Sequence, residues 1–509
     1  MEEPRLPIAS RAAGDRNFAA CVLLAYLPLA AFAMAHHEMW RDELHCWLVA
    51  RDSATPWAVV HNRAYDGQPP LWYLLLWVLE KTTHDPRSMQ LVHLGIAAAA
   101  VWVFARFAPF GRPVRALFPF GYFLAYEYAA ISRCYGLALL FVLLLCVNHR
   151  RRLERPLVTA LLLAALALTT TVATMVAAGY AASLVLDWIA AERTGDRAAR
   201  WAWIPIAAAT LAGVAAGACA WPPADSTVAH VRWPTQMPSD DAPTRLIAGL
   251  LPIPRADFFF WNSNVLLCCE PFRRVALAVS LLLATWILFV LSRDRASVAI
   301  FAVGSALLVA LFATVYGGDV RHHGFFFVLF LMGAWIARSG PAGVHVSGWT
   351  RFRQAALVPT LGVVLSVHLV AAAIAIGYDY RYIFSSGRRA AELLRARGLA
   401  DALLVAEVDF PATAVLGQLG PRAWAHSPRT GRRFSFVKWT QDRHWDPTDE
   451  QTLTYAQGLA ASRGEDAILL LNRPLIPKLV DGTTVSCIAE LYDSMIEEEN
   501  FYVYRVARR

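Results

Sequence analysis

Residues 156–186, PLVTALLLAALALTTTVATMVAAGYAASLVL, form an apolar stretch without a charged side chain. The hydrocarbon layer of a bilayer is about 30 Å thick, and a helix that crosses it takes about 20 apolar residues. The stretch is therefore long for one span and short for two. Thr169, Thr170, Thr171 and Thr174 lie near its middle, where their hydroxyls can bond nearby backbone groups in a tight turn. We expect two spans that break at these threonines.

Similar apolar runs occur on both sides of this stretch. With 57% hydrophobic and only 17% charged residues, the chain is more apolar than a soluble core requires. The further runs are residues 18–35, 88–105, 116–126, 134–148, 201–221, 275–292, 296–318, 322–337 and 354–378. Together they predict a polytopic α-helical membrane protein with about eleven transmembrane helices.

The distribution of arginine predicts the orientation of these spans, because cytoplasmic loops gather Arg and Lys near helix ends. If residues 156–186 are divided, the arginine-bearing loops all lie on one side: Arg106/Arg112/Arg115, Arg150/Arg151/Arg152/Arg155, Arg193/Arg197/Arg200, Arg293/Arg295 and Arg338/Arg351/Arg353. This predicts a plasma (inner) membrane protein with a cytoplasmic amino terminus and an extracytoplasmic carboxyl-terminal domain. These loops also account for the net charge of +8, and we expect no nucleic-acid partner.

The first outer loop, residues 36–87, is predicted to be structured. Its segment 71–79, LWYLLLWVL, is too short to cross a bilayer and is followed by charged residues. Trp72, Tyr73 and Trp77 suit the membrane interface, so we expect a helix along the outer surface. No small-residue cleavage pattern follows the first apolar run, which predicts an uncleaved first span.

The apolar runs end before Asp379. Residues 1–378 are therefore predicted to form the transmembrane domain, first outer loop included, and residues 379–509 an extracytoplasmic α/β domain. Within the latter we expect an amphipathic helix at 385–399, strands at 402–408, 466–472 and 501–507, and a strand-to-helix turn at 410–420. Residues 423–450 have no clear period and are predicted to be a loop.

Six cysteines fall on or near the predicted outer side, where a disulfide can persist in an oxidising compartment. They are Cys46, Cys134, Cys219, Cys268, Cys269 and Cys487. Their spacing does not specify a pairing.

Most unusual polar residues of the membrane half lie on the predicted outer face. The densest segment is 36–53, HHEMWRDELHCWLVARDS, in which Asp42 and Glu43 open a predicted helix. Apolar neighbours can exclude water and tune a carboxylate there. The structural alternative is that acids in a first helical turn only complement the helix dipole.

Three more segments of the same face carry such residues. Residues 66–71, DGQPPL, form a turn with His61 before it, residues 126–136 contain Glu127 and Arg133, and residues 316–323 read YGGDVRHH. Ionisable groups at membrane depth are costly and usually mark a pathway or a site. Each can also be a local salt bridge or a snorkelling anchor.

In order and sidedness these segments resemble the GT-C membrane glycosyltransferases, especially the protein O-mannosyltransferase and lipid A aminoarabinose transferase branch. The matching elements are Arg41-Asp42-Glu43-Leu44, Pro69-Pro70-Leu71, Ser132-Arg133-Cys134-Tyr135 and Arg321-His322-His323. The resemblance implies transfer of a sugar from a polyprenyl-phosphate carrier to an acceptor hydroxyl at the outer face of the membrane, with inversion.

By position, the resemblance implies that Asp42 is the general base and that Glu43 orients the acceptor. A carboxylate can take the acceptor proton, and guanidinium groups can hold the leaving phosphate. Arg133 and Arg321 are the first candidates for the phosphate. The remaining candidates for carrier or substrate binding are Arg41, His61, Gln68, Arg87, Glu127, Tyr135, Asp319, His322 and His323.

One residue departs from the pattern of the branch. Some relatives carry a Lys before the two prolines, where this chain has Gln68, whose amide can donate a hydrogen bond to a phosphate but carries no charge. The histidines and acids of residues 36–61 lack a strong metal-ligand spacing. We therefore expect no metal or other cofactor, with a divalent ion as the less favoured alternative.

Two other functions remain open. A transporter or flippase would use Asp42, Glu127, Arg133 and Arg321 along a substrate route, although internal repeats, common in transporters, are not visible. A non-catalytic assembly protein would keep the architecture alone. For a transferase, lipid, glycan and protein acceptors are all possible.

Overall fold

The computed structural model describes residues 8–195, 199–227, 242–339, 348–443, 446–480 and 482–508. These residues form two compact units. The helical unit comprises the described parts of residues 1–34, 92–219 and 230–378, and the mixed unit those of 35–91, 220–229 and 379–509. From the sequence we placed residues 36–87 with the membrane half, whereas the structure groups them with the carboxyl-terminal residues.

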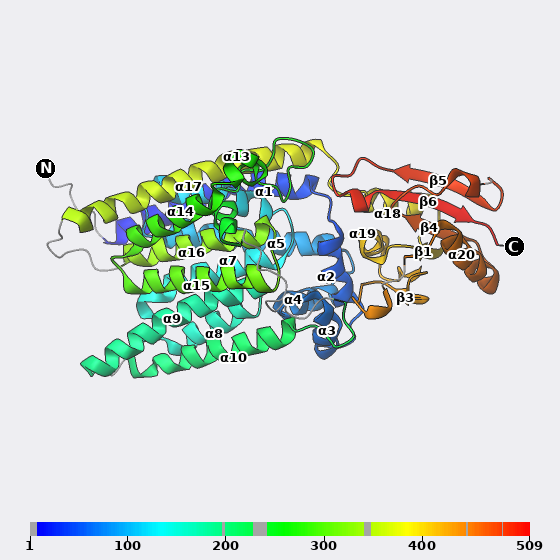
Figure 1. Ribbon diagram of the computed structural model, residues 1–509. Coiled ribbons are helices and arrows are strands. Elements are labelled where there is room, and N and C mark those ends of the chain that lie inside the picture. The colour runs from blue at the N-terminus through cyan, green and yellow to red at the C-terminus, as the bar shows by residue number, and fades with distance from the viewer. Residues whose placement is uncertain are drawn as a thin grey trace. The chain divides into compact units, whose positions relative to one another are not determined.

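The main helices of the helical unit run side by side (Figure 1). They are α1 (Ile8–His36), α5 (Arg87–Phe107), α7 (Cys134–Asn148), α8 (Pro156–Ala167), α9 (Thr171–Thr194), α10 (Trp203–Ala220), α14 (Ala276–Leu291), α15 (Arg295–Thr314), α16 (Val320–Ser339) and α17 (Gly348–Arg381). Short helices complete the unit: α6 (Arg112–Leu117), α11 (Arg245–Leu250), α12 (Val265–Cys268) and α13 (Glu270–Arg273).

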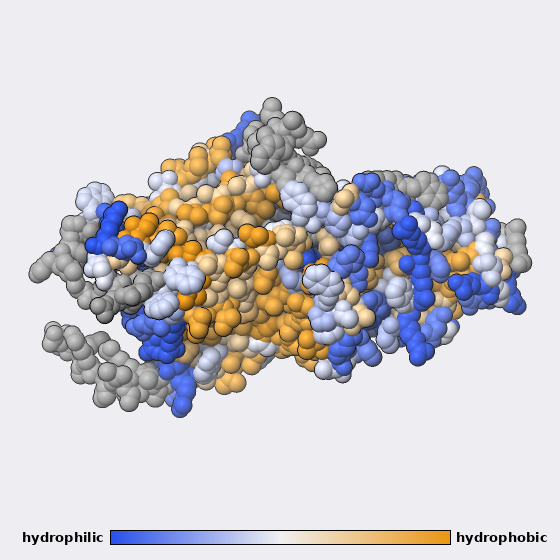
Figure 2. All heavy atoms as spheres, turned by 90° about the horizontal axis from the view of Figure 1, so that it is seen from below, coloured by the Kyte–Doolittle hydropathy of each residue, from blue (hydrophilic) through white to orange (hydrophobic). Residues whose placement is uncertain are grey.

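Among the described residues, nine helices are long and apolar enough to cross a membrane. They are Gly14–His36, Arg87–Phe107, Cys134–Arg151, Thr171–Thr194, Trp203–Ala220, Glu270–Leu291, Arg295–Thr314, Val320–Ser339 and Arg351–Arg381. Their surface is predominantly hydrophobic (Figure 2), with exposed side chains such as Leu24, Leu211 and Leu282. A large apolar surface of this kind marks an interaction site, and the length of the helices indicates a membrane-embedded protein.

Nine rather than about eleven helices of the described residues are long enough to span, because residues 116–126 and the first part of 156–186 form no long helix. Residues 116–126 pass from α6 into a 3-10 turn, Phe118–Phe120, and then into a π-helical turn, Phe123–Glu127. Pro119 cannot donate a backbone hydrogen bond, and the chain is extended at Gly121. The other exception is α8, a short apolar helix outside the nine.

The predicted break in residues 156–186 is confirmed. Helix α8 ends at Ala167 and α9 begins at Thr171, with Thr170 in an extended conformation between them. The Thr169 hydroxyl donates to the Leu166 carbonyl at 2.7 Å, and the Thr174 hydroxyl donates to the Ala167 carbonyl at 2.9 Å. The threonines thus bond backbone carbonyls that the end of α8 leaves without a helical partner.

Helix α16 forms the core of the helical unit, because its side chains are buried along nearly the whole length. It packs on α15, α11 and α7, and α15 packs in turn on α9. A Cβ atom added to Gly179 of α9 would lie 2.8 Å from the Ile300 carbonyl oxygen of α15. Glycine therefore allows these two helices the close approach that favours packing between membrane helices.

The mixed unit combines the helices of residues 41–80 with a six-stranded sheet. Its elements are α2 (Arg41–Arg51), α3 (Pro56–Asn62), α4 (Leu71–Glu80), α18 (Gly387–Ala396), β1 (Leu403–Ala406), α19 (Asp409–Leu419), β2 (Ala425–Ser427), β3 (Arg432–Phe434), α20 (Asp449–Arg463), β4 (Ala467–Leu471), β5 (Val485–Leu491) and β6 (Phe501–Val506). The strand order is β3-β2-β1-β4-β6-β5. Strand β1 runs parallel to β2 and β4, and the other pairs are antiparallel.

Most elements predicted for residues 379–509 are present as α18, β1, α19, β4 and β6, and the short helix predicted at 71–79 is α4. The prediction of a loop at 423–450 is wrong in part. This segment contains β2, β3 and the start of α20. Strands of three residues are too short for a period to be recognised. Strand β2 is fixed by its pairing with β1, and β3 by its pairing with β2.

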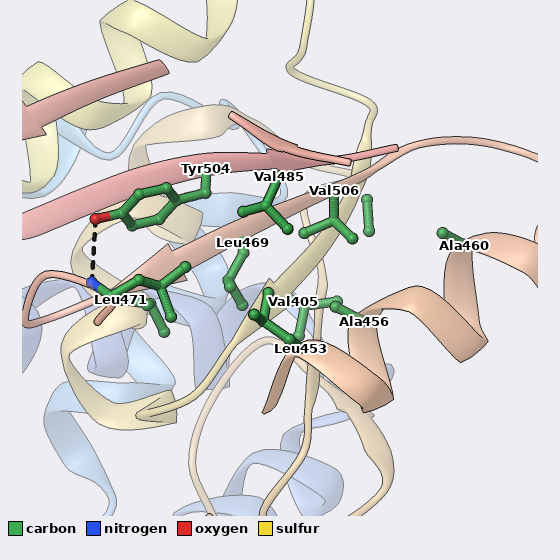
Figure 3. Close-up of a cluster of buried hydrophobic side chains, with 11 residues drawn as sticks. Val405, Leu453, Ala456, Ala460, Leu469, Leu471, Val485, Tyr504 and Val506 are labelled. Atoms are coloured by element: carbon green, nitrogen blue, oxygen red, sulfur yellow. Dashed lines mark hydrogen bonds between the residues drawn. The ribbon is translucent and has the colours of Figure 1, made fainter. Parts of the chain in front are cut away.

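Helix α20 covers one face of this sheet, and a hydrophobic core is buried between the helix and the sheet (Figure 3). Leu453, Ala456 and Ala460 of α20 pack against Leu469 of β4 and Val405 of β1. At the edge of the cluster, the Tyr504 hydroxyl accepts a hydrogen bond from the Leu475 backbone N–H at 3.1 Å. The core thus contains a tyrosine whose polar end is satisfied.

Candidate functional site

The amino end of α2 is held by a buried chain of three ionisable residues in the mixed unit. His37 donates from Nε2 to the Glu43 carboxylate and from Nδ1 to the Asp379 carboxylate, each at 3.1 Å. Glu43 has no exposed surface and also accepts from the Trp40 backbone N–H at 3.3 Å. Burial alone would lower the pKa of His37, but Asp379 and Glu43 outweigh it and raise that pKa well above its ordinary value. His37 is therefore a cation between two carboxylates.

Arg41 ties the same end of α2 to the segment before β6. Its backbone N–H donates to Glu499 at 3.1 Å, its guanidinium forms an ion pair with Glu498, and that guanidinium lies 4.8 Å from the centre of the Phe410 ring. Burial raises the pKa of Glu499 to about 7, against the lowering effect of Arg41. Arg41 therefore has structural contacts that the sequence did not reveal.

Further contacts fix the rest of α2. The Arg51 guanidinium donates to the carbonyls of Gly420 and Ala423 at 2.8 and 3.0 Å. Along the helix, Leu44 packs so closely on α19 that a Cβ atom on Gly417 would lie 2.9 Å from its side chain. Asp42, partly exposed in the first turn, is thus carried by a helix that is anchored at both ends.

The turn before α4 is held by Asp66. Its carboxylate lies 3.0 Å from His45 Nε2 and accepts from the Tyr73 hydroxyl at 2.8 Å. Gly67 has φ +64°, a conformation that favours glycine, and the Gln68 carbonyl accepts from Arg63. Gln68 is half-buried and His61 is exposed at the end of α3.

Arg87 lies beside a separate pocket of the mixed unit. The pocket has a volume of about 370 Å³, and its lining includes His84, Arg87, Arg388, Glu392 and Arg395. Arg388 pairs with Glu392 at 2.9 Å. The Arg87 side chain itself is exposed, so Arg87 contributes to an open, polar surface.

In the helical unit, two segments that the sequence singled out meet at the amino end of α16. The Tyr135 hydroxyl lies 2.8 Å from His322 Nε2, and the Tyr128 hydroxyl donates to the Arg321 carbonyl at 2.7 Å. Arg133 and Arg321 both act electrostatically on the His322 ring. Segments 126–136 and 316–323 therefore form one cationic and aromatic cluster, which we call the α16 cluster.

Asp319 is the carboxylate of the α16 cluster that pairs with Arg321. It pairs with Arg321 at 2.7 Å and accepts from the Asn262 side chain at 2.6 Å and from the Tyr316 hydroxyl at 3.0 Å. Burial would raise the pKa of Asp319, but the charge of Arg321 and the hydrogen bonds from Asn262 and Tyr316 together hold that pKa well below its ordinary value. Asp319 is therefore ionised and offsets part of the arginine charge.

The hydrogen bonds of His322 define its tautomer. The Asp319 backbone N–H donates to His322 Nδ1 at 3.0 Å, so Nδ1 carries no proton. A neutral ring then carries its proton on Nε2 and donates it to the Tyr135 oxygen. As a result, the Tyr135 hydroxyl proton is directed to an acceptor other than His322.

The other predicted residues of the helical unit support this cluster. Glu127 is buried and accepts from the Tyr122 hydroxyl at 3.0 Å. His323 Nε2 lies 3.0 Å from the Gly317 carbonyl oxygen, so it stabilises the loop before α16. The Arg321 guanidinium lies 5.3 Å from the centre of the Trp261 ring, a cation–π distance.

Sequence reasoning missed one residue that shapes the α16 cluster. His93 is completely buried, and its two ring nitrogens lie 2.9 and 2.8 Å from the carbonyl oxygens of Ala129 and Arg133. It thereby holds the turn that precedes α7. A lone histidine in the apolar run 88–105 was the available signal.

No group of three or more His, Cys, Asp or Glu side chains that could hold a metal occurs in the described part of the chain. The eight cysteines, all within that part, are free thiols.

No protein-family model, curated protein or solved structure matches this chain. The functional argument therefore depends on the chemistry of its own residues.

Proposed function

We propose that this protein is a membrane glycosyltransferase that moves a sugar from a polyprenyl-phosphate carrier to an acceptor hydroxyl at the outer face of the plasma membrane. The observation that carries the proposal is the α16 cluster, where Arg133 and Arg321 act on the same histidine beside the amino end of a 20-residue helix. Guanidinium groups and a helix amino end both favour a phosphate. The residue order of the GT-C glycosyltransferases, which this chain resembles, supports the same chemistry.

In the proposed reaction the α16 cluster holds the phosphate that leaves the sugar. Arg321 already pairs with the Asp319 carboxylate, so the phosphate either shares Arg321 with Asp319 or displaces it. The more negative the leaving phosphate oxygen becomes, the more strongly the arginines bind it. Stabilisation of charge that develops during the reaction is what accelerates a chemical step.

The resemblance to the GT-C glycosyltransferases assigns the role of general base to Asp42. As the acceptor oxygen forms its bond to the anomeric carbon, the hydroxyl proton passes to the Asp42 carboxylate. The bond between that carbon and the phosphate oxygen breaks, and its electron pair leaves with the phosphate. Attack from the side opposite the phosphate inverts the anomeric centre.

The role proposed here for Glu43 differs from the one that the resemblance implies. Because its carboxylate is buried against His37 and the Trp40 N–H, Glu43 is a positioning residue. It holds the first turn of α2 and so the backbone that carries Asp42.

Transfer from a labelled polyprenyl-phosphate sugar, in membranes with equal amounts of folded protein, tests the role of Asp42. The variant Asp42→Asn should lose at least about 100-fold in turnover, since a general base contributes that much or more, and should keep its affinity for polyprenyl phosphate. The exposed Glu154 provides the control Glu154→Gln, which should retain full turnover.

Two results would contradict the proposal. Unchanged turnover of Asp42→Asn would remove this residue as the base. Movement of a solute across sealed vesicles, with no consumption of the lipid-linked sugar, would favour a transporter.

A further inference from the structure

We infer that the sheet of the mixed unit carries a binding site for an anionic saccharide, separate from the residues proposed for sugar transfer. The site is a pocket of about 210 Å³ where β1 and β2 begin and α20 ends. Its side chains include Arg422, Trp424, His426, Arg433 and Arg463. We call it the sheet pocket.

Strand pairing explains why these side chains gather. Trp424 and His426 are two residues apart, so both point to the same face as the chain enters β2. In the antiparallel pair of β2 and β3, His426 lies directly opposite Arg433, which places their side chains next to each other. Arg463 is in the last turn of α20, and it acts on His426 together with Arg433.

Among the residues that the structure describes, no acid engages the arginines of the sheet pocket. Within the described residues, Arg422, Arg433 and Arg463 form no ion pair, although Asp401 and Glu465 line the same pocket. Burial and the charges of Arg433 and Arg463 lower the pKa of His426, so that ring is neutral at pH 7. The guanidinium groups thus remain available to a ligand.

The chemistry of the lining selects the ligand class. Arginine pairs bidentately with carboxylate and phosphate. The Arg433 guanidinium is stacked 4.8 Å from the centre of the Trp424 ring. This contact reduces the conformational freedom of the Arg433 side chain before a ligand binds. The Asp401 and Glu465 carboxylates repel a second anion but accept hydrogen bonds from hydroxyls. A sugar with one phosphate or carboxylate group satisfies both requirements. The volume is below the range for drug-sized ligands and suits a single ring.

The role of this ligand rests on the proposed function. If the protein transfers a sugar to a glycan or glycolipid, the sheet pocket holds an anionic residue of the acceptor. Occupation of the pocket would then lower the acceptor KM without taking part in the chemical step.

Calorimetric titration of the full-length protein in nanodiscs of phosphatidylcholine tests the binding. Glucuronic acid and glucose 6-phosphate are the probes, with glucose and inorganic phosphate for comparison. We expect both anionic sugars to bind at least about tenfold more tightly than glucose. In Arg433→Gln/Arg463→Gln their affinity should fall by at least about tenfold, because hydrogen bonds to charged groups contribute that much or more.

Two matched variants separate this effect from misfolding and from general charge loss. Arg433→Lys keeps the charge without the planar fork and should give an intermediate affinity. Arg397 is exposed at the end of α18, outside the pocket, and Arg397→Gln should bind like the wild type.

Unchanged binding of glucuronic acid to the double variant would overturn the site. Equal affinity for inorganic phosphate and glucose 6-phosphate would overturn its saccharide specificity. Binding to vesicles with anionic lipid, in the absence of sugar binding, would assign the arginines to the membrane surface instead.

The acceptor role is tested separately from the proposed transfer. If Arg433→Gln/Arg463→Gln raises the acceptor KM and leaves kcat unchanged, the role is supported. If KM stays the same while Asp42→Asn abolishes turnover, the acceptor role fails and the proposed function stands. Because titration requires no polyprenyl donor, anion binding can also succeed where the transfer reaction fails.

Discussion

The amino ends of α2 and α16 both combine a histidine with ionised groups, but their charges are balanced in opposite ways. At α2, the His37 cation lies between the buried carboxylates of Glu43 and Asp379. At α16, a neutral His322 lies within the fields of Arg133 and Arg321, and Asp319 is the carboxylate that pairs with Arg321. The first arrangement is matched within the protein and is suited to structure. The second gathers two guanidinium groups around a neutral ring and is suited to an anionic ligand.

The largest effect is expected from breaking the matched site. In His37→Leu two buried carboxylates lose their common cation, which should lower the free energy of unfolding by about 3–5 kcal/mol. Thermal unfolding of the purified protein measures this loss. The exposed His61 provides the control His61→Leu, which should change stability by less than about 0.5 kcal/mol. Equal stability of the two variants would mean that the ion chain does not hold α2.

The second effect is a change of folding stability with pH, which has opposite signs at the two sites. Glu499, beside Arg41, has a pKa raised by burial from its ordinary value of 4.5 to about 7, so the folded state binds its proton more tightly than the unfolded state does. Its contribution to stability is complete below pH 4.5 and is lost as the pH rises to about 7. At roughly 1.4 kcal/mol for each pKa unit, the loss is about 3 kcal/mol.

Thermal unfolding between pH 4.5 and 8 tests this contribution. Glu499→Gln should remove the decrease in stability, whereas Glu497→Gln, at an exposed position, should keep it. Asp319 has the opposite sign, because its pKa is lowered in the folded state. Its contribution is present above pH 3.8 and is lost as the pH falls further. A Glu499→Gln variant with the wild-type pH profile would contradict the assignment.

The third effect distinguishes stability from ligand binding at α16. Arg321→Gln should weaken polyprenyl phosphate binding by roughly 10- to 100-fold, as expected for the loss of charge-assisted hydrogen bonds, and should also destabilise the protein because Asp319 loses its cation. Arg321→Gln/Asp319→Asn should recover stability but not binding. The exposed Arg274 provides the control Arg274→Gln. Recovery of binding in the double variant would show that Arg321 serves only Asp319.

The smallest effect concerns the two tyrosines of the α16 cluster. Tyr135→Phe removes the acceptor of the His322 Nε2 proton and leaves a buried donor without that partner, which should cost about 1–3 kcal/mol. Tyr128→Phe removes a donor to the Arg321 carbonyl and should cost about 1 kcal/mol. Thermal unfolding compares both with Tyr492→Phe, at an exposed position. A larger loss for Tyr128→Phe would contradict the tautomer assigned to His322.

Local patterns predicted the elements whose cause is local. The break between α8 and α9 followed from threonines in an apolar run, and helix α4 and strand β4 followed from their apolar character and length. Residues 116–126 were misjudged because hydrophobicity alone does not distinguish a membrane helix from buried irregular backbone. Here Pro119 interrupts the run, and the surrounding protein buries the residues of the irregular segment.

The sequence by itself determined that this chain is rich in helices long and apolar enough for a bilayer, and it located the acidic and basic residues worth attention. Only the tertiary structure decided that Glu43 is buried against His37, that Tyr135 meets His322, and that three arginines gather at the sheet pocket. The physical reason is that hydrophobicity and turn chemistry act between neighbours in the chain. The partner of an ionised side chain instead depends on tertiary packing, which brings His37 and Asp379 together across 342 residues of sequence.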